Sequence, residues 1–293
     1  MKTILVTGAS GQLGRCFEKL SSDYPQFDFF FTTSSEVDIT KKCELHQLFG
    51  AKYFDFCINC AAYTNVEKAE SEQQKAFQVN AEAVKNLAEI CQASGTMFFH
   101  FSTDYVFNGK ANSPYSEKDK TDPINNYGAS KLKGEENIRN VADKYFIFRT
   151  SWLYSEFGHN FFRTILNKAK EGAHLKITTA QKGTPTNAND LAKLVMKLIA
   201  SENDEVGVYH FSNKGEATWY DFAEEILKIS GNTEAVKLEK SNDYKTVAER
   251  PAYSVLDKTK LRNNLNYEMP HWKESLKGLY DLEIASKREK ENL

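Results

Sequence analysis

Residues Ile4–Gly14 read ILVTGASGQLG, and of all segments in the sequence this one indicates the fold most directly. Its glycines, Gly8, Gly11 and Gly14, have the spacing G-x-x-G-x-x-G, and they directly follow a strand pattern and open a helical one. The first glycine permits a tight turn, the second lets the backbone approach a pyrophosphate, and the third allows the helix to pack closely on the strand. Free N–H groups and the helix dipole then face the anion. The stretch predicts a dinucleotide-binding turn, against the alternative of a glycine turn kept only for its geometry.

Strand-like apolar runs alternate with helical patterns through roughly the first two hundred residues, which is typical of a parallel sheet covered on both faces. The expected strands are Lys2–Thr7, Phe27–Thr32, Phe54–Asn59, Met97–Ser102, Tyr145–Thr150 and Val206–Phe211. The expected helices are Gln12–Ser22, Glu67–Ser94, Asn126–Asp143, Gly158–Gly172 and Asn187–Ser201. We therefore predict an α/β fold, a doubly wound parallel sheet of the Rossmann type.

The alternation loosens after residue 150, and the later sequence is richer in charge and asparagine. We interpret this part as a smaller, interleaved C-terminal lobe that binds the substrate. The predicted domains are residues 1–150 for the dinucleotide, with 187–212 returning to that domain, and residues 151–186 and 213–293 for the substrate lobe.

Charge and hydropathy exclude several classes of protein. The chain has 38 basic and 40 acidic residues, a net charge of -2, and no segregation of either sign. No basic field indicates nucleic acid, and no basic amphipathic helix indicates a membrane surface. Apolar runs such as Met97–Phe101 are far too short to span a bilayer. We expect neither nucleic acid nor membrane as a partner.

The cysteines are odd in number, and they fit reduced thiols in the cytoplasm. They are Cys16, Cys43, Cys57, Cys60 and Cys91. Cys57 and Cys60 form a C-x-x-C at the end of a predicted strand, where residues three apart point to opposite faces. No second cysteine pair or nearby histidine completes a zinc site. We interpret the pair as two ordinary buried thiols and assign no metal ligand.

Tyr127 and Lys131 form Y-G-A-S-K, and four residues apart on a helix they share one face. A nearby ammonium favours an ionised phenol, so we expect Lys131 to lower the pKa of Tyr127 from about 10 toward neutrality. Such a tyrosine suits a general acid that meets a developing alkoxide. Lys131 is also placed to hold a cofactor ribose. The pair alone is not specific, because tyrosine and lysine meet in this way by chance on many helices.

The segment FSTDYVF, residues 101–107, lies at the carboxyl end of the fourth predicted strand, where open α/β sheets bind ligands. Ser102 and Thr103 place hydroxyl groups there to bind a carbonyl oxygen, and Asp104 and Tyr105 would face the substrate. The alternative is a strand that simply runs into a turn. The predicted catalytic set is Thr103, Tyr127 and Lys131.

Two other loops border the predicted cofactor site. NCAAYT, residues 59–64, brings small residues such as Ala61 to a strand end where a backbone can approach a nicotinamide. The second strand runs into TTSS, with no arginine and no acid before Glu36, so this end accepts either ribose and repels no phosphate. We expect NADPH or NADH, with a slight preference for NADPH. Asp38 and Ile39 follow and border the expected adenine position.

Together, the glycine turn, NCAAYT followed by VEKAES, STDYVF and YGASK resemble the extended short-chain dehydrogenase/reductases. Four more motifs occur in the order found in the dTDP-4-dehydrorhamnose reductases of that superfamily. They are RTSWLY (149–154), QKGTPT (181–186), GEATWYDFA (215–223) and RPAYSVLD (250–257). The resemblance extends over nearly the whole chain, and STDYVF with RTSW is far more specific than the glycine turn.

The resemblance implies roles for individual residues. Those that contact the dinucleotide are Gly8, Gly11, Gln12, Leu13, Asp38, Ile39, Ala62, Tyr63, Thr64, Tyr127 and Lys131, to which the patterns above add Gly14 and Ala61. Those that contact the sugar nucleotide are Thr103, Asp104 and Trp152, with Arg250 beside its diphosphate. Without the resemblance, Trp152 would be a core aromatic residue and Arg250 a surface charge.

The implied activity is the NAD(P)H-dependent reduction of the C4 ketone of dTDP-4-dehydro-β-L-rhamnose to dTDP-β-L-rhamnose, a step of carbohydrate biosynthesis. One alternative is another nucleotide-sugar reductase or epimerase of the superfamily, against which RTSW and QKGTPT argue. The other is a non-catalytic regulatory subunit resembling the methionine adenosyltransferase β subunit, against which the intact Thr103–Tyr127–Lys131 set argues. Some family members bind Mg²⁺ between subunits, but no carboxylate cluster here allows ligands to be assigned. A homodimer is left open.

Overall fold

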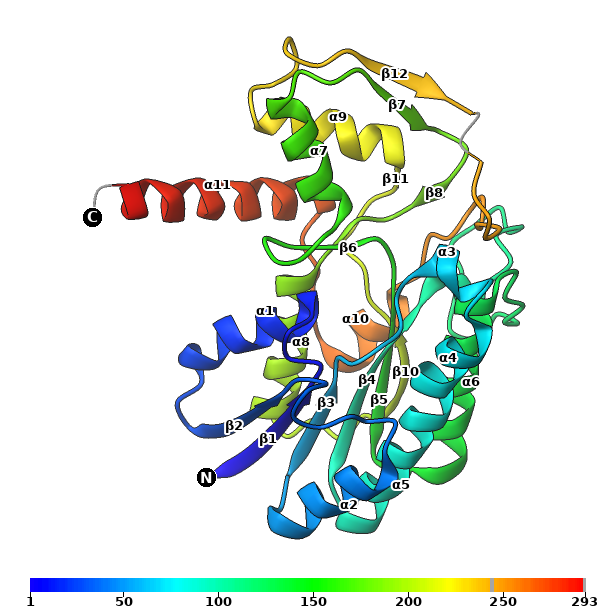
Figure 1. Ribbon diagram of the computed structural model, residues 1–293, viewed down its shortest axis with the longest axis vertical. Coiled ribbons are helices and arrows are strands. Elements are labelled where there is room, and N and C mark those ends of the chain that lie inside the picture. Colours follow the sequence, from blue (N-terminus) through cyan, green and yellow to red (C-terminus); the bar gives the residue numbers. More distant parts are fainter. Residues whose placement is uncertain (243–244, 292–293) are drawn as a thin grey trace.

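The computed structural model describes residues 1–242 and 245–291, and its centre is a sheet of six parallel strands (Figure 1). The strands are β1 (Lys2–Thr7), β2 (Phe27–Thr32), β3 (Phe56–Asn59), β4 (Met97–Thr103), β5 (Tyr145–Thr150) and β10 (Gly207–His210). Each predicted strand is confirmed, with bounds that move by one or two residues at most. The order β10-β5-β4-β3-β1-β2 changes direction between β1 and β3, and the carboxyl ends of strands at such a point are where open α/β sheets commonly bind ligands.

Helices cover both faces of this sheet, which confirms the doubly wound fold. The helices on one face are α1 (Gln12–Leu20), α8 (Ala188–Ala200) and α10 (Thr259–Leu265). Those on the other are α2 (Lys42–Ala51), α5 (Ala83–Ser94) and α6 (Asn126–Val141). Neighbouring strand residues alternate between the two cores, as Val6 packs in the first and Leu5 in the second. Burial on both faces explains why these strands are almost continuously apolar.

The helix predicted over Glu67–Ser94 is interrupted, and this part of the prediction is wrong. The segment folds as α3 (Val66–Ala69), α4 (Gln73–Phe77), a π-helical turn (Gln78–Glu82) and α5. The π-helical turn carries Asn80, whose fully buried side chain hydrogen-bonds the backbone of the loop after β3. A π-helical turn inside a helix is frequent at functional sites. Here it serves a polar contact that hydrophobic spacing does not reveal.

A second lobe lies beyond the carboxyl ends of the strands, at the top of Figure 1. Its elements are β6 (Leu153–Tyr154), α7 (Phe161–Lys170), β7 (Leu175–Thr178), β8 (Lys182–Gly183), β9 (Thr186–Asn187), β11 (Ala217–Thr218), α9 (Trp219–Ile229), β12 (Leu238–Ser241) and α11 (Trp272–Glu291). It has its own core, around Phe162, Ile226 and Trp272. The chain enters this lobe after β5, returns to the sheet through α8 and β10, and leaves again, so the two parts are interleaved. Residues 243, 244, 292 and 293 of the predicted lobe lie outside the described residues.

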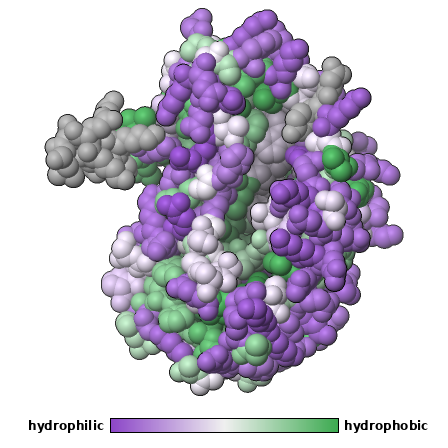
Figure 2. All heavy atoms as spheres, in the orientation of Figure 1, coloured by the Kyte–Doolittle hydropathy of each residue, from purple (hydrophilic) through white to green (hydrophobic). Residues whose placement is uncertain are grey.

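Figure 2 shows hydrophilic side chains over much of the surface on this side, with apolar residues near β2, an edge strand of the sheet. Lys52 lies 5.2 Å from the centre of the Phe30 ring and pairs with Asp28 at 2.8 Å. A charged side chain over an edge strand discourages pairing with another sheet. Within residues 1–242 and 245–291, no helix is long and apolar enough to cross a membrane.

Candidate active site

The predicted glycine turn joins β1 to α1 and packs against the loop after β3. Gly8 has φ +66°, and a Cβ atom there would come within 2.5 Å of the Ala61 nitrogen. A Cβ atom at Gly14 would come within 2.5 Å of the Gly8 carbonyl oxygen. Only glycine fits both positions without a shift of backbone. The turn is therefore a compact backbone cradle.

This cradle fits a dinucleotide. Helix α1 begins at Gln12 after Gly11, and no side chain caps it, so its first N–H groups are available to a phosphate. Leu13 packs its side chain into the core, which leaves its backbone as the part able to reach a ligand. The Gln12 side chain accepts a hydrogen bond from Asn160 Nδ2 at 2.7 Å, and this bond ties the second lobe to the turn.

Asn80, which the sequence analysis missed, holds the loop after β3. Its Oδ1 accepts the backbone N–H of Tyr63 at 2.9 Å, and its Nδ2 donates to the Tyr63 carbonyl oxygen at 3.0 Å. Nδ2 also contacts Ser130 Oγ at 3.0 Å, and Ser130 bonds back to the carbonyl oxygen of Tyr127. The loop with Ala62 and Thr64 is thus joined to the helix that carries the tyrosine.

Helix α6 carries Tyr127 and Lys131 toward the end of β4. Asn125 caps this helix by accepting the Gly128 N–H at 2.7 Å, and its Nδ2 donates to the Glu249 carbonyl oxygen at 2.8 Å. A Cβ atom at Gly128 would lie 2.2 Å from the Tyr105 carbonyl oxygen, so glycine allows α6 to approach the segment after β4. The ring of Tyr105 meets that of Tyr127 edge to face at 5.9 Å.

Thr103 and Tyr127, 24 residues apart in the sequence, come together here. The Thr103 side chain is buried at the end of β4, and its hydroxyl group faces the Tyr127 phenol and has a lowering effect on the pKa of that phenol. Thr103 Oγ1 also donates to Asp104 Oδ1 at 3.1 Å and accepts the Tyr105 N–H at 3.2 Å. Two hydroxyl groups at the carboxyl end of a central strand can bind one carbonyl oxygen and supply a proton to it.

The expected lowering of the Tyr127 pKa by Lys131 is wrong for this structure. Burial, and then the Asp104 carboxylate, raise the pKa of Tyr127 to about 12, while the Thr103 hydroxyl opposes them. Lys131 acts elsewhere, because its Nζ lies 3.4 Å from His100 Nε2. Burial lowers the pKa of Lys131 to about 8, against the effect of Glu135. The phenol is therefore held as a proton donor at neutral pH.

Ser102 does not join Thr103 in this site, which corrects a second expectation. Successive strand residues face opposite ways, and Ser102 Oγ donates instead to Glu135 Oε1 at 2.5 Å. The buried Glu135 carboxylate also accepts hydrogen bonds from Arg149 Nε at 2.9 Å and from Arg149 Nη2 at 2.7 Å. Ser102 thus belongs to an ionic network beneath the site.

Trp152 and Arg250 lie in or beside the second lobe. Trp152 has φ +48°, which is uncommon for a bulky residue, and its ring stacks on Trp219 at 3.8 Å. Arg250 Nη2 bonds Glu67 Oε1 at 2.6 Å, while Glu67 Oε2 accepts the N–H groups of Val247 and Ala248. Glu67, which was not predicted as a site residue, therefore joins the segment before Arg250 to α3.

The end of β2 contains a carboxylate that bears on the cofactor. Glu36 Oε2 accepts the N–H and the hydroxyl of Thr33, each at 2.8 Å, and these bonds lower the pKa of Glu36. Asp38 Oδ1 accepts the N–H and the hydroxyl of Thr40 and so stabilises a turn. Ile39 is buried against the core. A negative charge thus stands after β2, which corrects the expectation that nothing at this end repels a phosphate.

The cysteines are free, and the C-x-x-C pair is divided between two cores as predicted. Cys57 is buried on one face of the sheet, whereas Cys60, which was expected to be buried as well, is only partly buried against the other. In the part of the chain that the structure describes, no three His, Cys, Asp or Glu side chains are grouped to hold a metal ion.

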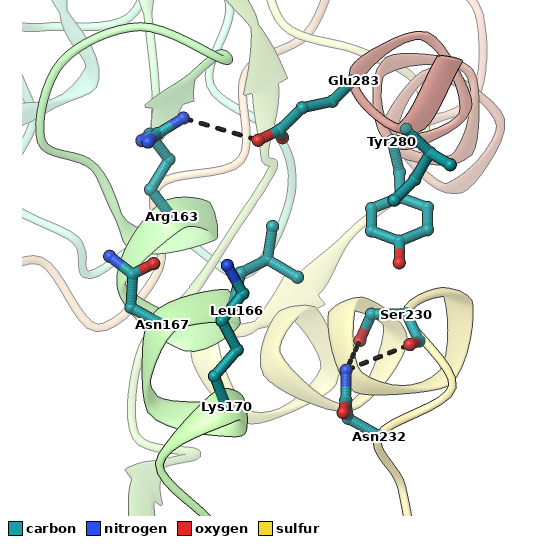
Figure 3. Close-up of a pocket in the computed structure, with 9 residues that line it drawn as sticks. Arg163, Leu166, Asn167, Lys170, Ser230, Asn232, Tyr280 and Glu283 are labelled. Carbon is teal, nitrogen blue, oxygen red and sulfur yellow. Dashed lines mark hydrogen bonds and ion pairs between the residues drawn. The ribbon is translucent and has the colours of Figure 1, made fainter. Parts of the chain in front are cut away.

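A cavity of about 100 Å³ lies away from this site, between α7, the end of α9 and α11 (Figure 3). Arg163 and Glu283 approach each other to 3.6 Å at its edge. None of the predicted site residues lines it.

Comparison with known proteins gives a consistent result. The family model described as RmlD substrate binding domain matches residues 1–283. A dTDP-4-dehydrorhamnose reductase of Aggregatibacter actinomycetemcomitans is 37% identical, over 95% of this chain and 98% of that protein. One from Escherichia coli K12 is 38% identical, over 94% and 96%.

Solved structures agree in fold. The crystal structure of a dTDP-4-dehydrorhamnose reductase from Clostridium acetobutylicum has a TM-score of 0.90 and 39% identity, covering 96% of this chain and 99% of that one. The Bacillus anthracis reductase, solved in complex with NADP, has a TM-score of 0.91 and 35% identity with the same coverage.

Proposed function

Since the chain belongs to the RmlD substrate-binding-domain family, whose relatives are dTDP-4-dehydrorhamnose reductases, we propose that it reduces dTDP-4-dehydro-β-L-rhamnose to dTDP-β-L-rhamnose. The reaction uses a nicotinamide cofactor, as expected from the NADP complex of a homologue. The structural observation that supports this chemistry is the approach of the Thr103 hydroxyl to the Tyr127 phenol at the end of β4. No observation favours an epimerase or a regulatory subunit.

The glycine turn, the start of α1 and the loop after β3 are the proposed dinucleotide site. When bound, the cofactor supplies the hydride for the C4 carbon of the sugar. The residues proposed to hold it are Gly8, Gly11, Gln12, Leu13, Gly14, Asp38, Ile39, Ala61, Ala62, Tyr63, Thr64, Tyr127 and Lys131. The bare backbone of the turn and the uncapped helix start support this assignment. The slight preference for NADPH remains a proposal.

Thr103 and Tyr127 have different proposed roles at the carbonyl oxygen. The Thr103 hydroxyl binds this oxygen and polarises the C4 ketone. Tyr127 gives its proton to the same oxygen as negative charge develops there. A pKa of about 12 supports this role, because the phenol then carries its proton throughout the neutral range. Lys131 completes the proposed set from the next turn of the helix.

The substrate is proposed to lie between the sheet and the second lobe. Asp104 and Tyr105 would meet it from the end of β4, Trp152 from the start of the second lobe, and Arg250 at the diphosphate. Residues 1–150 and 187–212 would then serve the dinucleotide, and residues 151–186 and 213–293 the sugar nucleotide.

Tyr127→Phe tests the proposed acid. We expect turnover to fall by about 10²–10⁴-fold, the usual contribution of a general acid, with little change in the Kd of NADPH. The measurement is NADPH oxidation with prepared dTDP-4-dehydrorhamnose, beside a fluorescence titration of the cofactor. Tyr53→Phe is the matched control, because Tyr53 is exposed and lies just before β3, at the amino ends of the strands and away from the carboxyl end of β4. Full turnover in Tyr127→Phe would remove the tyrosine from the mechanism.

A further inference from the structure

Lys131 meets a chain of buried polar groups that the proposed mechanism does not use. Its Nζ lies 3.4 Å from His100 Nε2, and His100 Nδ1 lies 3.1 Å from Asn59 Nδ2. Asn59 Oδ1 in turn accepts the backbone N–H of Ala61 at 3.2 Å and the Thr7 hydroxyl at 2.7 Å. Both His100 and Asn59 are almost completely buried. This series of polar contacts thus extends from the loop after β3 to the proposed catalytic lysine.

The direction of these hydrogen bonds follows from their chemistry. A backbone N–H can only donate, so Ala61 requires the oxygen of the Asn59 amide, and the NH₂ group must face His100. That NH₂ group is also only a donor, so His100 Nδ1 must accept from it. Reversal of the amide would place two donors together at Ala61. The tautomer of His100 is therefore fixed from outside the ring.

A neutral imidazole whose Nδ1 accepts carries its proton on Nε2. His100 is neutral, because burial alone holds its pKa below the usual range, and Lys131 lowers it further whenever the lysine is charged. The Nε2–H group therefore faces Lys131 Nζ. An ammonium has no lone pair and cannot accept this hydrogen bond, whereas a neutral amine can.

We propose that His100 is a positioning residue for Lys131: Asn59 fixes its tautomer, so that its Nε2–H group faces Nζ and binds the lysine as a neutral amine. The protonated form of Lys131 finds no acceptor at His100, because its own N–H groups face the Nε2–H group of the ring. The contact therefore selects one charge state of the lysine.

The charged groups around Lys131 oppose one another, so the contact with His100 decides between the ammonium and the neutral amine. From α6 itself, Glu135 favours the ammonium, but β5 supplies Arg149, which takes both oxygens of that carboxylate. From the segment after β4, Asp104 raises the pKa of Tyr127, which α6 also carries. Burial favours the amine, and the pKa of about 8 places the change of charge near neutrality. The titration of Lys131 needs no substrate, so it tests this contact independently of the proposed function.

The first test reads the tautomer directly. The ¹⁵N chemical shifts of the His100 ring, assigned by comparison with His100→Gln, distinguish a protonated Nε2 from a protonated Nδ1. We expect the Nε2–H form in the wild-type protein without ligands. A ring protonated on Nδ1 would overturn the proposal.

The second test uses Asn59→Asp to reverse the direction of the hydrogen bonds between residue 59, His100 and Lys131. A carboxylate can accept from Ala61 with one oxygen and from His100 Nδ1–H with the other, so Nε2 becomes an acceptor for the ammonium of Lys131. The pKa of Lys131 should then rise by about one unit or more, through both the new bond and the added charge. The ¹⁵N shifts of His100 should change to the Nδ1–H form, and this readout separates the tautomer from the charge.

Lysine titration is followed by ¹³C NMR of the Cε carbons, with Lys131→Met to assign the signal. Lys258 is an internal control, because burial also lowers its pKa to about 8 while it bonds Ser212 and Asn213 instead. Its titration should not change in Asn59→Asp. His100→Gln should keep the Lys131 titration close to wild type, since glutamine can accept from Asn59 and donate to the lysine. An unchanged Lys131 titration in Asn59→Asp, or a large shift in His100→Gln, would contradict the proposal.

Discussion

At the scale of single residues, burial sets the charges of this site more than pairing does. Asp104 is almost fully buried, and this desolvation raises its pKa to about 6, although the hydroxyl groups of Ser254 and Thr103 oppose the rise. Tyr127 and Lys131 are each moved toward the neutral form by the same cause. The site is therefore prepared for proton transfer and not for a permanent ion pair.

Asp104→Asn should change how stability depends on pH. Because the folded-state pKa of Asp104 is raised, the folded protein binds its proton more tightly, and stability is lost as pH rises from about 4 to about 6. The variant lacks this loss, so its free energy of unfolding should exceed that of the wild type by up to about 3 kcal/mol at pH 7. Below pH 4 it should show no such gain. Urea unfolding at the two pH values measures it. Parallel pH profiles of the two proteins would refute the argument.

Glu36→Gln should shift cofactor choice toward NADPH. The exposed Glu36 carboxylate stands after β2, where a 2′-phosphate would meet its negative charge. Removal of that charge should raise the ratio of kcat/KM for NADPH over NADH a few-fold, since solvent screens exposed charges. Glu18→Gln, an exposed change on α1, is the control. A ratio that stays constant would show that Glu36 does not influence the ribose end.

At the scale of elements, the strands were predictable and the polar supports of the site were not. Continuous apolar runs reveal buried parallel strands, and STDYVF and YGASK revealed Thr103 and Tyr127. His100 and Asn80 were missed because a buried polar residue inside an apolar strand or helix follows no spacing rule. Helix α11 could have been predicted, since Trp272, Leu276 and Leu279 recur at helical spacing.

Gly183→Ala should weaken binding of the sugar nucleotide. A Cβ atom on this β8 residue would come within 2.8 Å of the Trp152 ring, which must then move from its stack on Trp219. Because Trp152 is proposed to contact the sugar, we expect KM for the substrate to rise about tenfold, the effect of roughly 1.4 kcal/mol of lost contact. The Kd of NADPH should not change. Gly50→Ala, where nothing lies within 4 Å, is the control, and an unchanged substrate KM in Gly183→Ala would contradict this role.

At the scale of the whole molecule, a few polar contacts connect the sheet to the second lobe. Gln12 bonds Asn160, Lys19 pairs with Glu156 at 2.7 Å, and Glu67 pairs with Arg250. These contacts begin at α1 and α3, which border the proposed cofactor site. A crevice between two lobes is a common place for a ligand that both must contact. The sequence motifs predicted both lobes but not these connections, because each joins residues more than a hundred positions apart.

The most direct measurement of the central claim is identification of the product. The purified protein would be incubated with dTDP-4-dehydrorhamnose and NADPH, and the sugar nucleotide would be analysed by NMR while the oxidised cofactor is quantified. We expect dTDP-β-L-rhamnose, with one cofactor oxidised for each sugar reduced. Unchanged substrate, or an epimerised ketone formed without net oxidation of NADPH, would contradict it.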